Sequence, residues 1–510
     1  MRTPASRRRG LLCRIAHCAL LSLLFVCPWL ICPCRTVSAE PWTVTGDVQR
    51  VSDPAIIKSD GKYYIFCSGP GIPVRVSGDM HQWDLLAPVF ADVPEWAREK
   101  VPGARWIWAP DISFRDGRYW LYYAVSTLGS RRSVIGLATN ATLDARDPAF
   151  RWQDHGLVWE THETDNYNAI DPNAVESSDG QLYLAFGSFW TGLKMVVLDR
   201  ETGKPKPGAE LKPVASRPGA EAIEGACIVR HGEYFYMFCS HDFTARKLAS
   251  TYKIVVGRSR EATGPFVDRS GRAMLEGGGT TIVANDARWR GPGHNSVLED
   301  NGMTWLVYHA INPVGRTSLT LRIDTIHWTD DGWPEVEKPL PPVFGWWERT
   351  LAGKTMTIHL LPDGKIDSPS GPATWTVTGD TLEVRWPDPG KPGSVITERC
   401  TVASDRRSFS GRDSQGSPIF GRMSVIGWWE HRVGNGAASM VRLLPDGRID
   451  DVAAGAAWKQ MGDTLEFRWP NTSAPGGVWI DTLKLSADHS TYEGSNQKGF
   501  KISGWQVASE

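Results

Sequence analysis

The segment DGRYWLY at residues 116–122 joins a Gly-centred turn to a strand rich in aromatic residues. Four other segments repeat this arrangement, at residues 60–66, 179–186, 231–238 and 301–308. Asp-Gly or Asn-Gly between two β-rich runs predicts a hairpin, because the type I′ turn needs positive φ at both central residues. The central glycines, at 61, 117, 180, 232 and 302, are spaced at intervals that suit one four-stranded blade each. The repeat predicts an all-β fold with a five-bladed propeller.

A polar residue stands shortly before each of the five turns. These residues are Asp53, Asp111, Asp171, Glu224 and His294. The innermost strand of every blade lines the propeller axis, so we expect the five side chains to converge on one funnel. A simpler interpretation is that the Asp-Pro pairs only start strands after turns. Five polar residues in register with five hairpins favour a shared site.

Residues 1–39 are predicted to be a signal peptide. Arginines at 7–9 form a basic start, residues 20–30 an apolar core, and residues 37–39 (VSA) a small-residue cleavage site. The apolar core is short for a membrane span, and no later stretch approaches about 20 apolar residues. We therefore expect a secreted or periplasmic protein without a membrane span.

Composition excludes several classes of protein. The formal net charge of −1 gives no reason to expect nucleic acid as a partner. Five of the nine cysteines fall in the predicted signal peptide. The other four, at 67, 227, 239 and 400, are too few for a disulfide scaffold and lack the spacing of a zinc site. Most of the 24 tryptophans are expected in blade cores.

A different repeat follows the predicted propeller. The tetrapeptide GWWE at 345–348 returns at 427–430, and LLPDGKID at 360–367 returns as LLPDGRID at 443–450. Short β runs alternate with Asp-Gly and Gly-Asp turns, which predicts two tandem small antiparallel barrels or sandwiches. Prolines at 339, 341 and 342 mark the expected boundary. The predicted parts are therefore the signal peptide at 1–39, the propeller at 40–340, and the two β-rich repeats at 341–424 and 425–510.

The role of the tandem repeats stays open between two interpretations. Two copies could bind a polysaccharide at two points, which would raise avidity without new contacts. Alternatively, Trp346, Trp347, Trp428 and Trp429 could be core residues of a spacer.

The funnel carries the groups that glycosidic bond cleavage needs. That reaction uses one ionised carboxylate to activate water and one protonated carboxyl to donate to the leaving oxygen. Asp53 and Glu224 are the natural pair, since they belong to non-adjacent blades. Asp171 would be a third carboxylate close to Glu224, and a nearby like charge raises the pKa of the acid. Asp111 could bind substrate hydroxyls or only hold its strand.

Short motifs at each of these positions resemble glycoside hydrolase family 43. They are SDPAI at 52–56, WAPD at 108–111, YNAIDPN at 167–173, EAIEG at 221–225 and GPGHN at 291–295. Within the family they most resemble the endo-acting α-1,5-L-arabinanases, and the resemblance covers nearly the whole first domain. It implies a five-bladed propeller and an inverting mechanism, with Asp53 as general base, Asp171 as the orienting and pKa-raising carboxylate, and Glu224 as general acid.

The resemblance also implies a metal ion, usually calcium, near His294 at the propeller centre. Calcium prefers oxygen ligands, so water would have to supply most of the coordination. The alternative is that His294 is a hydrogen-bonded core residue. The expected substrate-contacting residues are Trp108, Asp111, Asn168, Phe189 and Trp190. Blade packing is the alternative for the aromatic ones.

Three departures from the family pattern affect the edge of the cleft. Ser52 stands where the family often has His, Gly225-Ala226 follows the acid where Ala-Pro is common, and residues 241–247 lack the cysteines that many arabinanases carry. None of them removes a catalytic carboxylate.

The sequence predicts a secreted, monomeric, calcium-assisted hydrolase that cleaves α-1,5-linked arabinan, including the arabinan side chains of pectin, in the endo mode. An exo-acting α-L-arabinofuranosidase or β-xylosidase is an alternative on the same fold. A non-catalytic arabinan-binding propeller is a weaker alternative, because it predicts loss of one of the three carboxylates.

Overall fold

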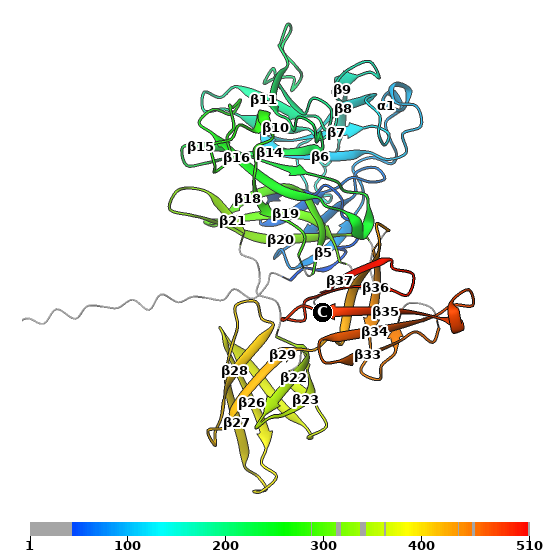
Figure 1. Ribbon diagram of the computed structural model, residues 1–510. Coiled ribbons are helices and arrows are strands. Elements are labelled where there is room, and N and C mark those ends of the chain that lie inside the picture. The colour runs from blue at the N-terminus through cyan, green and yellow to red at the C-terminus, as the bar shows by residue number, and fades with distance from the viewer. Residues whose placement is uncertain are drawn as a thin grey trace, which may run out of the picture. The chain divides into compact units, whose positions relative to one another are not determined.

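The computed structural model describes residues 43–286, 288–312, 318–336, 343–361, 364–436, 438–450 and 454–507. The predicted signal peptide and the prolines at 339–342 lie outside these residues. Strands dominate the described chain, and its one α-helix is α1 (Glu95–Lys100) (Figure 1). No helix in these ranges is long and apolar enough to cross a membrane.

Five antiparallel sheets form the five predicted blades, which confirms the propeller. In blade 1 the short strand β1 (Thr45–Gly46) also pairs in parallel with the outermost strand. The strands, blade by blade, are β2 (Ala55–Ser59), β3 (Lys62–Phe66), β4 (Val74–Ser77) and β5 (Gln82–Leu86); β6 (Trp108–Arg115), β7 (Arg118–Val125), β8 (Ser133–Asn140) and β9 (Gln153–Thr161); β10 (Asn173–Glu176), β11 (Leu182–Phe186), β12 (Leu193–Val197) and β13 (Lys212–Ala215); β14 (Ile223–His231), β15 (Tyr234–His241), β16 (Lys253–Ser259) and β17 (Thr280–Val283); β18 (Arg290–Asp300), β19 (Met303–Ile311), β20 (Leu319–Trp328) and β21 (Pro334–Val336).

The repeated hairpins adopt the predicted turn at three of the five positions. Both central residues have positive φ at 60–61, 116–117 and 301–302. At 179–180 and 231–232 only the glycine has positive φ, so these turns are of another type. Each blade still places its aromatic strand second, against the strand that lines the axis.

The N-terminal segment of the described chain closes the ring of blades. The backbone N–H of Val51 donates to the Leu319 carbonyl, and the N–H of Leu321 donates to the Val48 carbonyl. These bonds join the start of blade 1 to β20 of blade 5. Apolar side chains fill the spaces between blades, and β8 is buried along its whole length.

The first C-terminal repeat is a closed eight-stranded barrel in which β29 pairs with β22. Trp347 is fully buried inside it, whereas Trp346 is half-buried. Its strands are β22 (Gly345–Leu351), β23 (Lys354–Leu360), β24 (Lys365–Asp367), β25 (Ala373–Thr378), β26 (Thr381–Pro387), β27 (Val395–Val402), β28 (Ser408–Asp413) and β29 (Pro418–Met423).

The second repeat has the same strand sequence but does not close by a full strand pair. Its sheet runs β32-β31-β30-β37-β36-β35-β34-β33, and a single bridge between Arg448 and Ala457 links the two ends. Trp429 is buried as Trp347 is, which supports a core role for this pair of tryptophans. The strands are β30 (Gly427–Val433), β31 (Ser439–Leu443), β32 (Ile449–Asp450), β33 (Ala457–Met461), β34 (Thr464–Pro470), β35 (Val478–Leu485), β36 (Thr491–Asn496) and β37 (Lys501–Val507).

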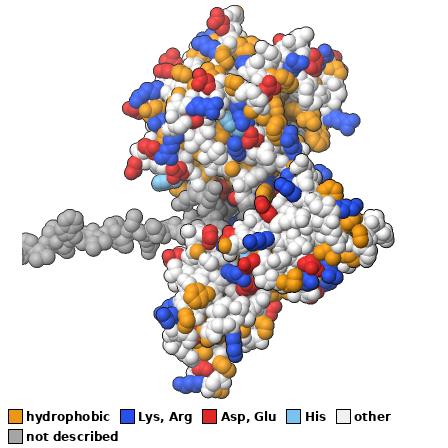
Figure 2. Space-filling model, viewed as in Figure 1, with side chains coloured by type: hydrophobic (Ala, Val, Ile, Leu, Met, Phe, Trp, Pro, Cys, Tyr) orange, Lys and Arg blue, Asp and Glu red, His pale blue; other side chains and the backbone are white. Residues whose placement is uncertain are grey.

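Charges of both signs are interspersed over the face shown in Figure 2, in keeping with the net charge of −1.

Candidate active site

A cavity of about 300 Å³ is lined by residues from all five blades. It brings together Asp53, Asp171, Glu224 and His294, four of the five polar residues that precede the repeated turns. Blade 2 contributes Trp108 in place of Asp111. The rest of the lining consists of Ser52, Leu128, Ile170, Thr244, Ala245, Lys247, His309, Ile311 and Leu319.

Unusual backbone conformations turn several of these side chains towards the cavity. Asp53, Asp171 and His294 have φ of 52°, 55° and 49°, in the left-handed region that non-glycine residues seldom adopt. Such conformations cost of order 1–3 kcal/mol each and cluster at functional sites. Glu224 reaches the cavity differently, from a register shift in β14 between Glu224 and Cys227.

Gly225, one of the three departures from the family pattern, has a physical reason in this chain. Its φ is 64°, and a Cβ at this position would lie 3.2 Å from Nδ1 of His294. A larger residue would therefore be strained in its backbone and would crowd the imidazole.

Asp53 is held by hydroxyl and imidazole groups. Its Oδ2 accepts hydrogen bonds from Ser68 and, at 3.0 Å, from Ser52, while its Oδ1 lies 3.1 Å from Nδ1 of His294. Burial alone would raise the pKa of Asp53, but His294, His309 and the two serines outweigh burial and lower it. Asp53 is therefore ionised at neutral pH.

The pKa of Glu224 is shifted in the opposite direction from that of Asp53. Burial, together with the charge of Asp53, raises the pKa of Glu224 to about 7, although a hydrogen bond from Tyr252 opposes the shift. The pKa of Asp171 is also raised, first by burial and then by the charges of Glu224 and Asp53. Because the two carboxyls repel each other's charge, the pair retains a proton near neutral pH. One cavity thus contains an ionised carboxylate and a protonated carboxyl.

Two buried residues of the site were not predicted. The Tyr252 hydroxyl donates to Oε1 of Glu224 at 2.7 Å, and its ring stacks on His309 with centroids 5.9 Å apart. Nδ1 of His309 accepts the backbone N–H of Asp53 at 3.1 Å. Tyr252 therefore contacts the acid, His309 contacts the base, and the stacking of their rings links the two. His309 directly follows the aromatic residues of its repeated hairpin, the one signal by which it could have been found.

Asp111 and Asn168, two of the predicted substrate-contacting residues, do not line the cavity, and their contact with substrate stays a prediction. Asp111 accepts hydrogen bonds from the side chain of Asn173 at 3.0 Å and the backbone of Ala174 at 2.8 Å, so it ties β6 to β10. Burial raises its pKa to about 6. Asp111 lies outside the cavity lining because of a register shift in β6 between Trp108 and Pro110, which directs Trp108 to the cavity instead.

Asn168 holds a neighbouring segment instead of facing the cavity. It is 4% exposed, its Nδ2 donates to Oγ of Ser188 at 2.8 Å, and its Oδ1 accepts the Ser188 backbone N–H at 2.7 Å. Both ends of the amide are therefore used within the fold.

Phe189 and Trp190 lie beside the cavity and do not line it. Both are half-buried, with φ of 48° and 40°. The Phe189 ring is 6.1 Å from Phe243, whose neighbour Thr244 does line the cavity. The Arg131 guanidinium lies 5.6 Å from the Trp190 ring. These rings are available to a substrate that extends past the cavity.

The side chains around His294 do not by themselves form a calcium site. The described ranges contain no group of three or more His, Cys, Asp or Glu side chains that could hold a metal ion. Beside His294 lie Oδ1 of Asp53, at 3.1 Å from its Nδ1, and the imidazole of His309, whereas calcium takes six to eight oxygen ligands. We therefore derive no step of the reaction through a metal.

Comparison with known proteins places this geometry in a family. Residues 48–334 match glycosyl hydrolases family 43. The chain is 36% identical over 334 residues to the extracellular exo-α-(1→5)-L-arabinofuranosidase ArbA of Cellvibrio japonicus, covering 63% of this chain and 93% of that protein. It is 38% identical over 292 residues to the extracellular endo-α-(1→5)-L-arabinanase 1 of Bacillus subtilis, covering 56% and 87%.

A solved structure agrees with the sequence relatives. The α-L-arabinanase of Cellvibrio cellulosa in complex with arabinohexaose superposes with a TM-score of 0.56 at 37% identity, over 57% of this chain and 96% of that one. The matched range spans all five blades and includes the carboxyls that line the cavity. The chain therefore belongs to glycosyl hydrolases family 43 and is a glycoside hydrolase.

Proposed function

We propose that this protein is an inverting hydrolase that cleaves α-1,5-L-arabinofuranosidic bonds within arabinan, acting in the endo mode after export. One observation carries the reaction type: Asp53, with a lowered pKa, and Glu224, with a pKa raised to about 7, line the same cavity. The substrate is inferred from the names of two relatives, an exo-α-(1→5)-L-arabinofuranosidase and an endo-α-(1→5)-L-arabinanase.

In this mechanism Asp53 acts on water and Glu224 acts on the leaving group. The Asp53 carboxylate removes a proton from a water molecule as the water oxygen attacks the anomeric carbon. The bond between that carbon and the leaving oxygen breaks, and Glu224 transfers its proton to the departing oxygen. The anomeric configuration inverts, and exchange of one proton with solvent restores both carboxyls.

The surrounding residues keep the two carboxyls in these states. Burial, with the charge of Asp53, favours the protonated form of Glu224 before the reaction, and Asp171 is the second carboxyl of the pair that retains a proton. Tyr252 donates to Oε1 of Glu224, so the acidic proton is held on Oε2. Ser52 and Ser68 donate to Asp53 and favour its ionised form.

Exo action is the second candidate, because the Cellvibrio japonicus relative is named an exo enzyme. Calcium remains part of the proposal only as an ion that His294 and bound waters would hold. Chelation followed by thermal melting with and without added calcium tests this part, and unchanged melting would exclude a bound stabilising ion.

Product analysis on linear debranched arabinan tests the main proposal. We expect the wild-type protein to release a mixture of short oligosaccharides early in the reaction and Glu224→Ala to release none. Glu233→Ala, an exposed glutamate on the same blade, is the control and should keep full activity. Arabinose alone from the first time point would establish exo action. No product from the wild type would reject the hydrolase.

A further inference from the structure

A second cavity, of about 640 Å³, lies on blade 2, with lining residues separate from those of the candidate active site. Its walls come from the start of β7, the end of β8, the connection at residues 141–152 and the start of β9. We call it the β8–β9 cleft. Its volume is within the roughly 300–1,000 Å³ typical of small-molecule sites. None of its lining residues takes part in the proposed reaction.

The inner wall of this cleft is fixed by contacts within the fold. The Trp152 ring packs edge-to-face on Phe66 of blade 1, with centroids 5.8 Å apart. Oδ1 of Asn140, which is 2% exposed, accepts the Arg151 backbone N–H at 3.0 Å, and Thr139 bonds His155 at 2.8 Å. A ligand would therefore meet a wall that is already ordered, which lowers the entropic cost of binding.

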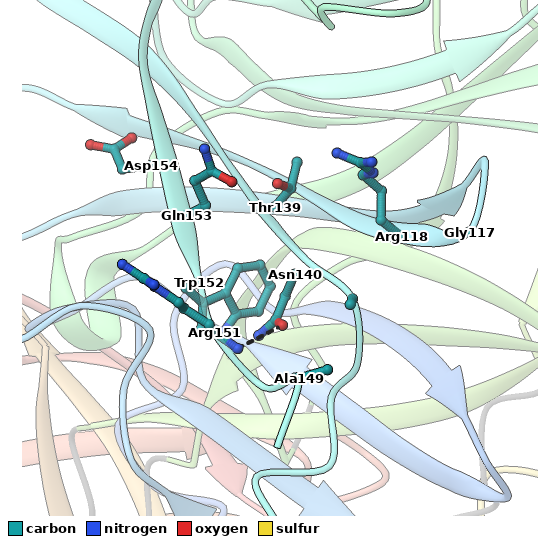
Figure 3. A pocket seen from close by; sticks show the side chains of 10 residues that line it. Gly117, Arg118, Thr139, Asn140, Ala149, Arg151, Trp152, Gln153 and Asp154 are labelled. Atoms are coloured by element: carbon teal, nitrogen blue, oxygen red, sulfur yellow. Dashed lines mark hydrogen bonds between the residues drawn. The ribbon is translucent and has the colours of Figure 1, made fainter. Parts of the chain in front are cut away.

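The unused hydrogen-bonding groups of the cleft are mostly donors. The guanidinium groups of Arg118 and Arg151 are exposed, and within the described chain neither donates a hydrogen bond or pairs with a carboxylate. Nδ2 of Asn140 is a buried donor without a partner in the same residues. In the view of Figure 3 the two arginines lie on either side of Trp152, with Asn140 next to the indole.

The one carboxylate of the lining, Asp154, is already used by the fold. Its Oδ2 accepts from the Trp96 indole at 2.9 Å, and its Oδ1 accepts from the Tyr123 hydroxyl at 2.8 Å and the Gly156 backbone at 3.1 Å. With two cations and one occupied anion, the lining favours a ligand that supplies acceptors and negative charge.

We propose that the β8–β9 cleft is a second saccharide-binding site that holds a carboxylate-bearing sugar, such as a uronic acid residue of a polysaccharide. Arg118 and Arg151, on opposite sides of Trp152, would each bind a carboxylate of an acidic chain, since guanidinium groups bind carboxylates in paired hydrogen bonds. The half-buried indole of Trp152 offers an apolar face to the sugar ring, and Asn140 a further donor. A neutral pentose chain has no carboxylate, so this ligand differs from the proposed substrate. Attachment to acidic polymer at a second point would raise the local concentration of enzyme on a mixed polysaccharide.

Titration calorimetry of the full chain with tetragalacturonate tests the proposal. We expect binding by the wild type that weakens with salt, and about tenfold weaker binding for each of Arg118→Ala and Arg151→Ala, since each loses charge-assisted hydrogen bonds. Arg105→Ala, another exposed arginine of the propeller outside the cleft lining, should bind as the wild type does. Because both target arginines are exposed, thermal melting should be unchanged in the variants.

Three outcomes would overturn the proposal. Absence of wild-type binding, or equal binding of a neutral tetrasaccharide, would remove the carboxylate as the recognised group. Displacement of tetragalacturonate by inorganic sulfate at equal concentration would reduce the cleft to a general anion site. Unaltered binding by the double arginine variant would place the bound sugar elsewhere.

Discussion

The centre of the propeller and the interiors of the two C-terminal barrels bury similar charged groups and use them differently. In the propeller, Asp53 lies 3.1 Å from His294 and both face a cavity. In the first barrel, Nε of Arg349 donates to Glu398 at 3.1 Å among packed aromatic rings. Burial of a charged group is therefore not by itself a sign of catalysis.

The two barrels bury different pairs of polar side chains at equivalent positions of the repeat. The sequence repeat aligns Arg349 and Glu398 of the first barrel with His431 and Asp481 of the second, where Nε2 of His431 is 3.6 Å from Asp481. Burial lowers the pKa of His431 to about 4 and raises the pKa of Asp481. The first barrel pairs a guanidinium with a carboxyl group, and in the second barrel the shifts favour the neutral forms of both partners. In the propeller, by contrast, the surroundings push two carboxyls apart in pKa, which is the pattern that acid–base catalysis needs.

The largest expected difference between these regions is in activity. Replacing Asp53 with Asn should lower kcat by about 10²–10⁴-fold, because an amide cannot accept the proton of water. The matched replacement Asp481→Asn keeps the hydrogen bond from Trp469 and should leave kcat unchanged. Initial rates on linear arabinan measure both. A loss of activity in Asp481→Asn with an intact fold would break the distinction between the two regions.

The second expected effect is on the stability of the first barrel. Arg349→Met leaves Glu398 buried without its partner, which should cost about 3–5 kcal/mol of unfolding free energy. Activity per folded molecule should not change, because the pair is outside the propeller. Denaturant unfolding followed with hydrogen exchange of β22 and β28 measures the loss.

Double replacement of Arg349 and Glu398 by apolar residues of similar size is the control. Such replacements are often neutral or stabilising, so the double variant should recover much of the lost stability. Equal destabilisation in the single and double variants would show that the pair contributes net stability.

The sequence was sufficient for the fold because its signals are local and repeated. Each hairpin carries its own turn, as Asp116-Gly117 shows, and five such units predict five blades without long-range information. The three carboxylates were also found, since their positions follow the same register. The β8–β9 cleft has no comparable pattern, because its walls come from three strands and a loop.

Other features of the site depend on tertiary geometry. Trp108 lines the cavity and Asp111 does not, because a bulge in β6 changes which side chains face the axis, and a one-residue shift reverses the faces of a strand. Tyr252, just before β16, contacts Glu224 of β14 only after both strands pair with β15 and the register shifts at Glu224. Such contacts depend on tertiary geometry that the spacing of residues does not encode.

A third prediction separates the two barrels by pH. The pKa of His431 is about 4 in the folded protein and about 6.5 in an unfolded chain, so the unfolded state binds more protons between these values. The second barrel should therefore lose stability, by up to about 3 kcal/mol, as pH falls from 6.5 to 4. In the first barrel, Arg349 takes the place of His431 and contributes no such loss, and the only loss of this kind there comes from His359, whose pKa is also lowered by burial. Hydrogen exchange of β30 and β22, corrected for the intrinsic rate at each pH, compares them.

Asp481 has the opposite effect on the pH dependence of stability, so its replacement is a control for the effect of His431. Its raised pKa contributes stability at low pH that is lost as pH rises through its folded pKa. Asp481→Asn removes this opposing contribution, so the loss of stability towards pH 4 should become steeper. An unchanged or shallower pH dependence of stability would contradict the claim that Asp481 opposes the effect of His431.

The smallest expected effect concerns the hydrogen bond by which Tyr252 lowers the pKa of Glu224. Its hydrogen bond to Oε1 favours the ionised form of Glu224 and so holds the pKa of this acid below the value that burial alone would give. Tyr252→Phe should therefore shift the alkaline limb of the kcat/KM profile, near pH 7 in the wild type, to higher pH. It should also lower kcat about tenfold, since the carboxyl loses one hydrogen bond that orients it.

Tyr236→Phe is the control. Tyr236 is a buried tyrosine of the adjacent strand that does not contact Glu224, so this variant should leave the alkaline limb in place. A lower kcat with an unmoved limb would mean that Tyr252 only packs against His309 and does not set the protonation of the acid.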